Sequence, residues 1–472
     1  MFRGAFFLGI SQTVLILTGF ILNIYLGRTL GPQLYGIFGV MNTFIVINEF
    51  LLMRGIYDAI SKLVAEKEES TNAIINSTFK WVTIGSFAVG FIYFFLAGQI
   101  AAIMNDHELT DYIKLFAFII PITAMSTVFI GALNGLRKFG RQALISITFY
   151  IIRLCAVVIL VVLGFSVKGA IIGLIISDLF KLAMAKGLYK PIGTDTVSDR
   201  RKIFKFIVEL MLTSVFAALI SNIDLMAVKA LLKENLETGF YTSAVTISKI
   251  PQFLILPISL AVMPVLSKSI SEGNIEITEK YVILSLRLLL IIVLPISLTI
   301  MATSEKCILL LYGDNYIQAS GPLNLLLLGA IFLCIKVVMF SVIVADGKPR
   351  YIIWIGLLSL LVEIILLITL TNRMGLMGAA AASAVTHFLG CVISYRYVAR
   401  RFMIHKMSIS VVRIMAASAL IYMIAAIYSP SGIVLVLYYG LLLLIYFIIL
   451  IIIKEINLID LKRKLRMGDE SL

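Results

Sequence analysis

Six ionisable residues lie deep inside long apolar runs of this sequence: Glu49, Arg153, Asp224, Lys249, Lys336 and Glu363. An ionised side chain at the centre of a membrane helix costs about 2.5–3.5 kcal/mol on insertion scales, so residues kept there mark a functional site by default. The arginine offers a bidentate fork to an anionic group, and the lysines offer point charges. The carboxylates are suited to binding H⁺ or Na⁺, or to balancing the cations.

Lys249 is followed by proline-rich sequence, SKIPQFLILPISLAVMP, with three prolines between residues 251 and 264. Each proline removes a backbone donor and bends or opens the helix. A lysine next to a helix that prolines bend or open in this way indicates a hydrated cavity. A buried ion pair between Lys249 and Glu49 is the structural alternative.

Four more polar residues in the first two apolar runs are weaker candidates. Arg54 and Asp58 are spaced i,i+4, so they can pair and guard the inner mouth of a cavity, or extend toward the membrane surface. Asn23 and Asn48 can bind ligand hydroxyl groups, but hydrogen bonding between helices is at least as good an interpretation for each.

The apolar runs dominate the composition. Of 472 residues, 61% are hydrophobic and 14% are charged, and the mean hydropathy is +1.05. A soluble domain of this size needs far more charge to cover its surface, so the chain is expected to lie in lipid. The runs reach the ~20 residues of a membrane-spanning helix, which predicts an all-α polytopic membrane protein.

Glycine, proline, asparagine and charged residues divide the apolar runs into about fourteen spans. Their approximate extents are 5–29, 34–58, 78–103, 113–134, 142–164, 169–188, 207–230, 239–266, 281–303, 322–344, 351–371, 375–397, 408–428 and 432–453. The first span lacks a small-residue cleavage site, so we expect it to be retained as a helix. The connecting loops are too short to hold a further domain.

The net charge of +14 arises from 40 Lys and Arg against 26 Asp and Glu. With the N-terminus in the cytoplasm, the basic clusters at 137–141, 190–205, 396–406 and 462–466 all lie inside, as the positive-inside rule requires. The charge therefore indicates orientation and not a nucleic-acid partner. We expect a multi-pass protein of the cell membrane with both termini cytoplasmic.

The chain also repeats itself. LGPQLYGIFGVMNTF at 30–44 parallels ENLETGFYTSAVTIS at 234–248, and RKFGRQALIS from Arg137 parallels DGKPRYIIW from Asp346. Each repeat holds six spans, so both halves insert in the same direction. This predicts two six-helix lobes related by a pseudo-two-fold along the membrane normal, with the site between them.

The repeat also predicts the domain boundaries. The N-terminal lobe is 1–188, the cytoplasmic linker 189–206 and the C-terminal lobe 207–400. Two extra helices at 401–454 fall outside the repeat and are expected at the periphery, followed by a cytoplasmic tail at 455–472. The last helix is apolar all round, which suits contact with lipid.

Three stretches resemble a known family. They are GRTLGPQLYGIF with AISKLVAE at the second span, NIDLMAVKALLKENLETGFYTSA at the seventh, and LYGDNYIQASGPLNLLLLG at the tenth. Their order resembles the polysaccharide transporter branch of the multidrug/oligosaccharidyl-lipid/polysaccharide exporter superfamily. The resemblance implies a flippase that moves polyprenyl-diphosphate-linked oligosaccharide from the inner to the outer leaflet by alternating access. AISKLVAE and the two extra spans also resemble the lipid II flippases, which is the alternative.

The resemblance gives the polar residues their roles. A central cavity would bind the lipid diphosphate and the sugars through Arg153, Lys249, Lys336, Arg54, Asn23 and Asn48. Ion coupling or charge balance would fall to Glu49, Asp224, Glu363 and Asp58. The expected partners are the lipid-linked glycan, the bilayer and H⁺ or Na⁺, and the protein is expected to be monomeric.

Other classes fit the sequence less well. A cation-coupled drug antiporter of the same superfamily should carry an acidic residue in its first span, and 5–29 has none. A membrane enzyme such as a glycan polymerase commonly needs a large outside loop, and the sequence has no HExxH, GxSxG or Walker motif. We therefore expect no enzyme activity, no metal site and no cofactor. A passive scaffold has no use for charged residues inside the membrane, which would only reduce its stability.

Overall fold

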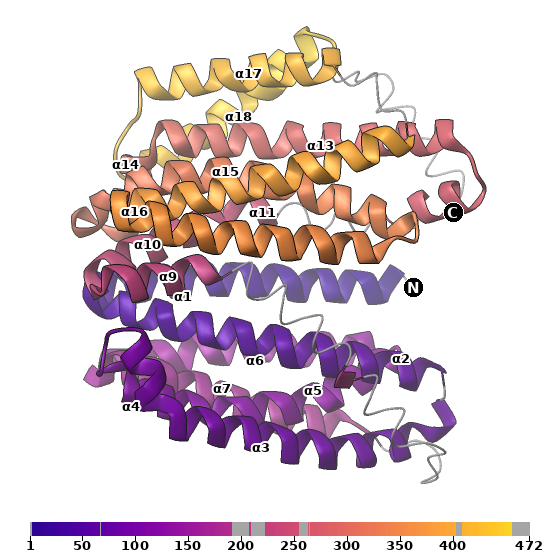
Figure 1. Cartoon of the computed structure of the whole chain (residues 1–472), viewed down its shortest axis with the longest axis vertical. Coiled ribbons are helices and arrows are strands. Elements are labelled where there is room, and N and C mark those ends of the chain that lie inside the picture. The colour runs from indigo at the N-terminus through magenta and orange to yellow at the C-terminus, as the bar shows by residue number, and fades with distance from the viewer. Residues whose placement is uncertain are drawn as a thin grey trace. The chain divides into compact units, whose positions relative to one another are not determined.

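The computed structural model describes residues 2–66, 68–190, 207–208, 222–253, 263, 265–402 and 408–455. Within these ranges every regular element is a helix (Figure 1). Long apolar runs favour this outcome, because a backbone in hydrocarbon must satisfy its polar groups internally and a helix does so within one segment. The all-α membrane fold predicted from the sequence is confirmed.

The chain forms two compact units, Met1–Thr242 and Ser243–Leu472, called unit 1 and unit 2 below. The linker predicted at 189–206 falls almost wholly outside the described residues. The predicted division into lobes, linker, extra helices and tail therefore stays a prediction.

Unit 1 holds a bundle of long helices. Its described elements are α1 (Phe2–Glu49), a π-helical segment (Phe50–Tyr57), α2 (Asp58–Glu66), α3 (Thr71–Ile103), α4 (Leu109–Ala117), α5 (Ile119–Gly135), α6 (Phe139–Leu160), a second π-helical segment (Val161–Phe165), α7 (Ser166–Leu188), α9 (Ile223–Leu232) and the first part of α10 (Asn235–Ser248). Helices α6 and α7 pack closely along each other, and α1 packs on α6. These three helices carry Glu49, Arg153, Asp178 and Lys181, whose contacts are described below.

Unit 2 is built from α11 (Ile250–Phe253), α13 (Ile275–Ala302), α14 (Ser304–Tyr312), α15 (Ser320–Ala345), α16 (Pro349–Phe402), α17 (Ser408–Ile427) and α18 (Val434–Ile452). Its core joins α13, α15, α17 and α18. Helix α18 buries only the stripe Leu435, Leu442, Tyr446 and Leu450. Tyr438, Ile445 and Ile449 are partly buried beside this stripe, and many of the other apolar side chains are exposed, as suits a helix in contact with lipid.

Two of the longest helices fold back at a single glycine. Gly31 interrupts α1 with φ 71°, and Gly375 interrupts α16 with φ 57°, a region of backbone space that glycine enters without a Cβ clash. Figure 1 shows the two arms of α16 side by side. Gly31 lies in the gap between the spans predicted at 5–29 and 34–58, and Gly375 is the first residue of the span predicted at 375–397.

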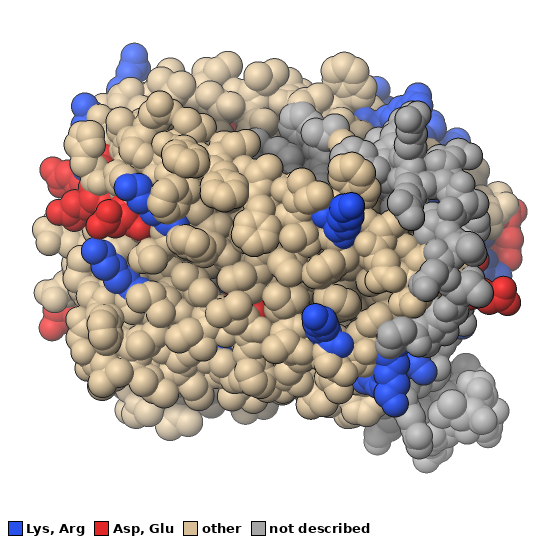
Figure 2. Space-filling model, turned by 90° about the horizontal axis from the view of Figure 1, so that it is seen from below, with Lys and Arg blue, Asp and Glu red and all other residues tan. Residues whose placement is uncertain are grey.

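Nine helical stretches in the described ranges are long and apolar enough to cross a membrane. Three of them have 44, 50 and 54 residues. Since ~20 residues cross the hydrocarbon, each of the three is long enough to cross twice. On the face seen in Figure 2, most charged side chains gather toward the two ends and uncharged side chains fill the middle. The count of fourteen spans stays a prediction, because parts of the seventh and eighth lie outside the described ranges.

Two helix ends that the predicted repeat pairs have the same hydrogen-bond pattern. The turn between α5 and α6 is closed by bonds from Leu136 N to Ala132 O and from Lys138 N to Leu133 O. The turn between α15 and α16 has the same pattern 210 residues later, from Asp346 N to Val342 O and from Lys348 N to Ile343 O. The two turns thus have the same local structure, and the pseudo-two-fold relation between the halves stays a prediction.

Candidate functional site

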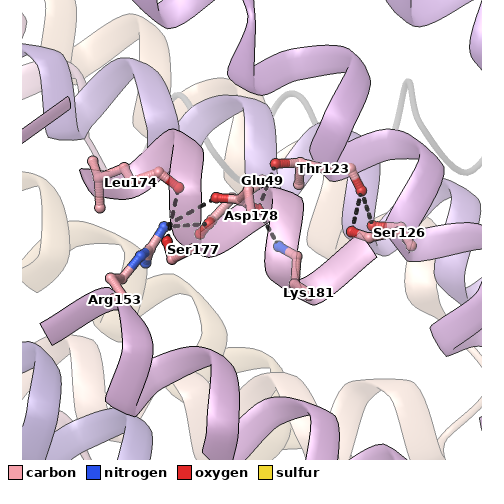
Figure 3. Close-up of polar contacts among 9 residues, drawn as sticks. Glu49, Thr123, Ser126, Arg153, Leu174, Ser177, Asp178 and Lys181 are labelled. Atoms are coloured by element: carbon pink, nitrogen blue, oxygen red, sulfur yellow. Dashed lines mark hydrogen bonds and ion pairs between the residues drawn. The ribbon is translucent and has the colours of Figure 1, made fainter. Parts of the chain in front are cut away.

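Arg153 joins three helices of unit 1. Its guanidinium on α6 contacts Glu49 at the end of α1, with 3.4 Å between Nη2 and Oε1. The same nitrogen lies 3.8 Å from Asp178 Oδ2 on α7. Figure 3 shows the three side chains converging from their separate helices. Glu49 and Arg153, both singled out from the sequence, are therefore direct partners.

Asp178 extends this network to a second cation. Lys181, one turn later on α7, forms an ion pair with Asp178, and the Thr123 hydroxyl on α5 donates to Asp178 Oδ1 at 3.0 Å. The Phe149 ring lies under both cations, with its centroid 4.8 Å from Arg153 Cζ and 4.2 Å from Lys181 Nζ. A buried aromatic face attracts such cations and holds them in place.

The charges of the network balance, and its side chains differ in how far they are exposed. It contains two carboxylates and two cations, which fits the rule that buried charges occur paired. The Asp178 side chain is fully buried, whereas Arg153 is 18% and Glu49 27% exposed. Arg153 Nε has no hydrogen-bond partner among the described atoms. The Arg153–Glu49 end is thus the more exposed part of the network.

A small cavity lies beside Glu49. Its lining includes Asn48, Glu49 and Thr123, and its volume of about 10 Å³ is close to that of one water position.

The two asparagines predicted as site residues both form hydrogen bonds within unit 1. The Asn48 amide donates to the Phe44 carbonyl at 2.9 Å and to Tyr93 Oη at 3.3 Å. Asn23, which lies in the first arm of α1 before Gly31, donates to the Gly19 carbonyl and accepts from Tyr35 Oη. Both asparagines thus make contacts inside the protein.

Unit 2 brings Lys336 and Glu363 together. Lys336 on α15 is 5% exposed and its Nζ lies 3.4 Å from His387 Nδ1 on α16. Glu363, also on α16, interacts electrostatically with Lys336 and accepts a hydrogen bond from Ser383 at 3.3 Å. Ser383 and His387 lie on the second arm of α16, beyond its break. The fold-back of α16 therefore creates this cluster.

The remaining predicted residues lie elsewhere. Asp224 on α9 accepts from Tyr241 Oη at 3.0 Å and from the Leu225 backbone at 2.8 Å. Lys249 is half-buried between α10 and α11, and Asp58 is exposed in the first turn of α2. The Arg54 side chain lies outside the described residues. The roles assigned to these residues stay predictions.

Asp178, Lys181 and His387 belong to these clusters without having been assigned a site role from the sequence. The i,i+3 spacing of Asp178 and Lys181 on α7 is typical of a structural pair, and the two side chains do form an ion pair. The position of both residues deep inside an apolar span was the sequence signal that could have marked them as site residues. In the sequence, His387 is a single histidine in an apolar run, which gives no sign of a site. Its contact with Lys336 depends on the tertiary structure.

Residues 25–321, more than half of the sequence, match the family of polysaccharide biosynthesis proteins. The chain belongs to this family. It is 23% identical over 386 residues to the putative O-antigen transporter of Shigella flexneri, covering 78% of this chain and 90% of that protein. It is 20% identical over 382 residues to the probable low-salt glycan biosynthesis flippase of Haloferax volcanii, covering 79% and 78%.

A solved lipid II flippase in an inward closed conformation has a similar structure. Its TM-score is 0.77 at 15% identity, with 98% of this chain and 100% of that chain covered. At this identity the likeness shows the fold. Together with the family match, it confirms the resemblance to the polysaccharide transporter branch drawn from the sequence.

Proposed function

We propose that this protein is a flippase that carries polyprenyl-diphosphate-linked oligosaccharide from the inner to the outer leaflet by alternating access. The observation that carries the proposal is the buried Arg153 network, inside the membrane helices of a chain from the polysaccharide biosynthesis family. The names of the two relatives support the same substrate class.

The geometry suggests how a diphosphate is bound. Arg153 holds Glu49 through a single long contact of 3.4 Å, while the deeper Asp178 also has Lys181 and Thr123 as partners. A diphosphate that displaces Glu49 gains a bidentate guanidinium, and Asp178 keeps Arg153 oriented. The released Glu49 carboxylate is then free to take up H⁺ or Na⁺, which links substrate binding to ion coupling.

The test uses proteoliposomes and a fluorescent polyprenyl-diphosphate-linked oligosaccharide. We expect Arg153→Gln to lower the initial flipping rate by about tenfold or more, and Arg153→Lys to keep part of it because the charge survives without the fork. The matched control is Lys168→Gln, which removes an exposed cation paired with Asp111 in the same unit. A wild-type rate in Arg153→Gln, at equal reconstitution, contradicts the proposal.

Folding and binding are separated by a second variant. Arg153→Gln leaves the Glu49 carboxylate without its partner, which can destabilise the protein by itself. Glu49→Gln/Arg153→Gln removes both charges and is expected to fold, yet still to flip slowly. Recovery of the wild-type rate in this double variant assigns the pair to structure alone.

Lys249 is proposed as a second cation for the diphosphate, on the basis of its position beside the proline-rich segment. The expected order of activity is Lys, Arg, Met and then Glu, because Arg keeps the charge, Met keeps only the stem and Glu repels the phosphates. Equal glycan export by Lys249→Met and wild type, at equal expression, removes Lys249 from the site.

The proposed oligosaccharide flippase and the alternative, a lipid II-type flippase, differ in the glycan that they move. The same proteoliposomes, supplied with a labelled lipid II-type peptidoglycan precursor, measure the alternative directly. We expect faster flipping of the polyprenyl-diphosphate oligosaccharide, in line with the family match. Faster flipping of the peptidoglycan precursor favours the lipid II alternative.

Orientation is proposed from the positive-inside rule, with both termini and the 189–206 loop in the cytoplasm. In a chain whose four native cysteines are replaced, cysteines at Ser198 and Ser431 should react with an impermeant reagent from opposite sides. Labelling of both from outside the cell refutes this orientation.

A further inference from the structure

A basic pocket lies at one end of unit 2. Its volume is about 440 Å³, within the range of small-molecule sites. It is formed by the turn that precedes α16 and by the last turns of the same helix, and its polar lining is Lys348, Tyr351, Arg396, Tyr397, Arg400 and Arg401. This is the end of α16 that the positive-inside rule places at the cytoplasmic membrane surface.

The wall of the pocket is fixed by buried Asp346. Its carboxylate, 2% exposed, accepts from Tyr397 Oη at 2.7 Å and pairs with Arg401 Nε at 3.3 Å. The Tyr351 and Tyr397 rings lie 4.6 Å apart, and Lys348 Nζ lies 5.7 Å from the Tyr397 ring centroid. The turn and the helix end are therefore held together before any ligand arrives.

Among the described residues, the pocket carries more positive charge than carboxylates neutralise. Asp346 is already engaged by Arg401 and Tyr397. Across the described ranges, no carboxylate forms an ion pair with Lys348, Arg396 or Arg400. Arg396 and Arg400 are also spaced i,i+4 on one helix face, where like charges repel. A bound anion would relieve this repulsion.

The corresponding place in unit 1 is built differently. The turn before α6 has the same backbone bonds as the turn before α16. There, however, Arg141 donates to the Leu188 carbonyl at 3.0 Å, at the point where α7 ends. Helix α16 continues to Phe402 and adds the turn that carries Arg400 and Arg401. Among the described residues, the two places therefore differ in the partners of their arginines.

We propose that this pocket binds the phosphate groups of a lipid headgroup at the membrane surface. Guanidinium groups bind phosphate oxygens bidentately, and the tyrosines suit the boundary between headgroups and acyl chains. Basic pockets between membrane helices on the cytoplasmic side attract such headgroups. Two lipids carry this chemistry here: an anionic phospholipid of the leaflet, and a polyprenyl diphosphate.

The experiment measures lipid binding to the purified full-length chain in neutral detergent by native mass spectrometry. The probes are phosphatidylglycerol, polyprenyl diphosphate and phosphatidylcholine, which has no net charge. The variant is Arg396→Gln/Arg400→Gln. The matched control is Arg373→Gln, an exposed arginine on the same helix near its break. Thermal unfolding of each variant confirms that it is folded.

We expect wild type and Arg373→Gln to bind at least one of the two anionic probes, and the double variant to bind it about tenfold more weakly or worse. Arg396→Lys/Arg400→Lys should keep most of the binding. Loss of phosphatidylglycerol alone assigns a leaflet phospholipid, and loss of polyprenyl diphosphate alone assigns the carrier lipid. Unchanged binding in the double variant, or an equal loss in Arg373→Gln, overturns the proposal. The outcome is independent of the flipping assay, because it measures binding alone.

Discussion

Gly36 and Gly239 touch each other's backbone in unit 1, where α1 meets α10. A Cβ on Gly36 would overlap the Asn235 carbonyl oxygen and lie 2.9 Å from Gly239 N, and a Cβ on Gly239 would overlap the Pro32 carbonyl oxygen. The predicted repeat pairs the same two glycines with each other. Because neither residue has a side chain, α1 and α10 can approach closely enough for their backbones to touch.

Substitution of Gly36 tests this contact. We expect Gly36→Ala to destabilise the protein, because the added methyl must push α10 away, at a cost of about 1–3 kcal/mol. Gly19→Ala in the same helix is the control, since nothing lies within 4 Å of its Cβ position. The measurement is the thermal unfolding midpoint in detergent. Equal midpoints for Gly36→Ala and Gly19→Ala disprove the close contact.

A polar cluster near the same contact depends on pH. Asp106 follows α3 and accepts from Lys229 at 2.7 Å and from Asn235 at 2.9 Å, with Lys229 1% exposed. Burial raises the pKa of the Asp106 carboxyl, but the hydrogen bonds from Lys229 and Asn235, the charge of Lys229 and the Glu108 backbone bond outweigh burial. The pKa therefore lies below its ordinary value.

A lowered carboxyl pKa gives the sign of the pH effect. The stabilisation is fully present above the unfolded pKa of about 3.9 and is lost as the pH falls through the lower folded value. We expect Asp106→Asn to lower the unfolding midpoint by about 2–5 °C at pH 7, and the gap to wild type to close below about pH 4. Asp111→Asn, whose side chain is 65% exposed, should leave the midpoint unchanged. A gap that is constant from pH 7 to pH 3 excludes this role of Asp106.

Lys336 and Glu363 should behave as a coupled pair. Lys336→Met removes the positive charge beside the buried Glu363 carboxylate, so we expect a large loss of folded protein, about 3–5 kcal/mol. Lys336→Met/Glu363→Gln removes both charges and should recover most of the stability. The yield of monodisperse protein and the unfolding midpoint measure both variants. Additive effects of the two substitutions would show that the residues act independently.

Glu455 should hold the last helix to its unit. It follows α18, is 1% exposed, and pairs with Arg287 of α13 at 2.6 Å and with Arg413 of α17 at 3.7 Å. We expect Glu455→Gln to lower the unfolding midpoint, since two arginines lose one carboxylate. Glu272→Gln, in an exposed pair with Lys268, is the control. The role is rejected when both variants unfold at the same temperature as wild type.

The sequence by itself determined the helices and their breaks. Hydropathy and the length of each run are local properties, and a glycine between two spans is enough to place a fold-back such as the one at Gly31. The buried charges were also visible, because Arg153, Lys336 and Glu363 stand in apolar surroundings where an ionised group is costly.

Only the tertiary structure decided which charges meet. Arg153 and Glu49 are 104 residues apart in the chain, and nothing local in either segment encodes their contact. Lys336 meets His387 because α16 folds back against α15, and Lys229 meets Asp106 across 123 residues. Hydrophobic periodicity fixes which face of a helix is buried, but the partner on that face is set by how the helices pack, and packing is a property of the whole bundle.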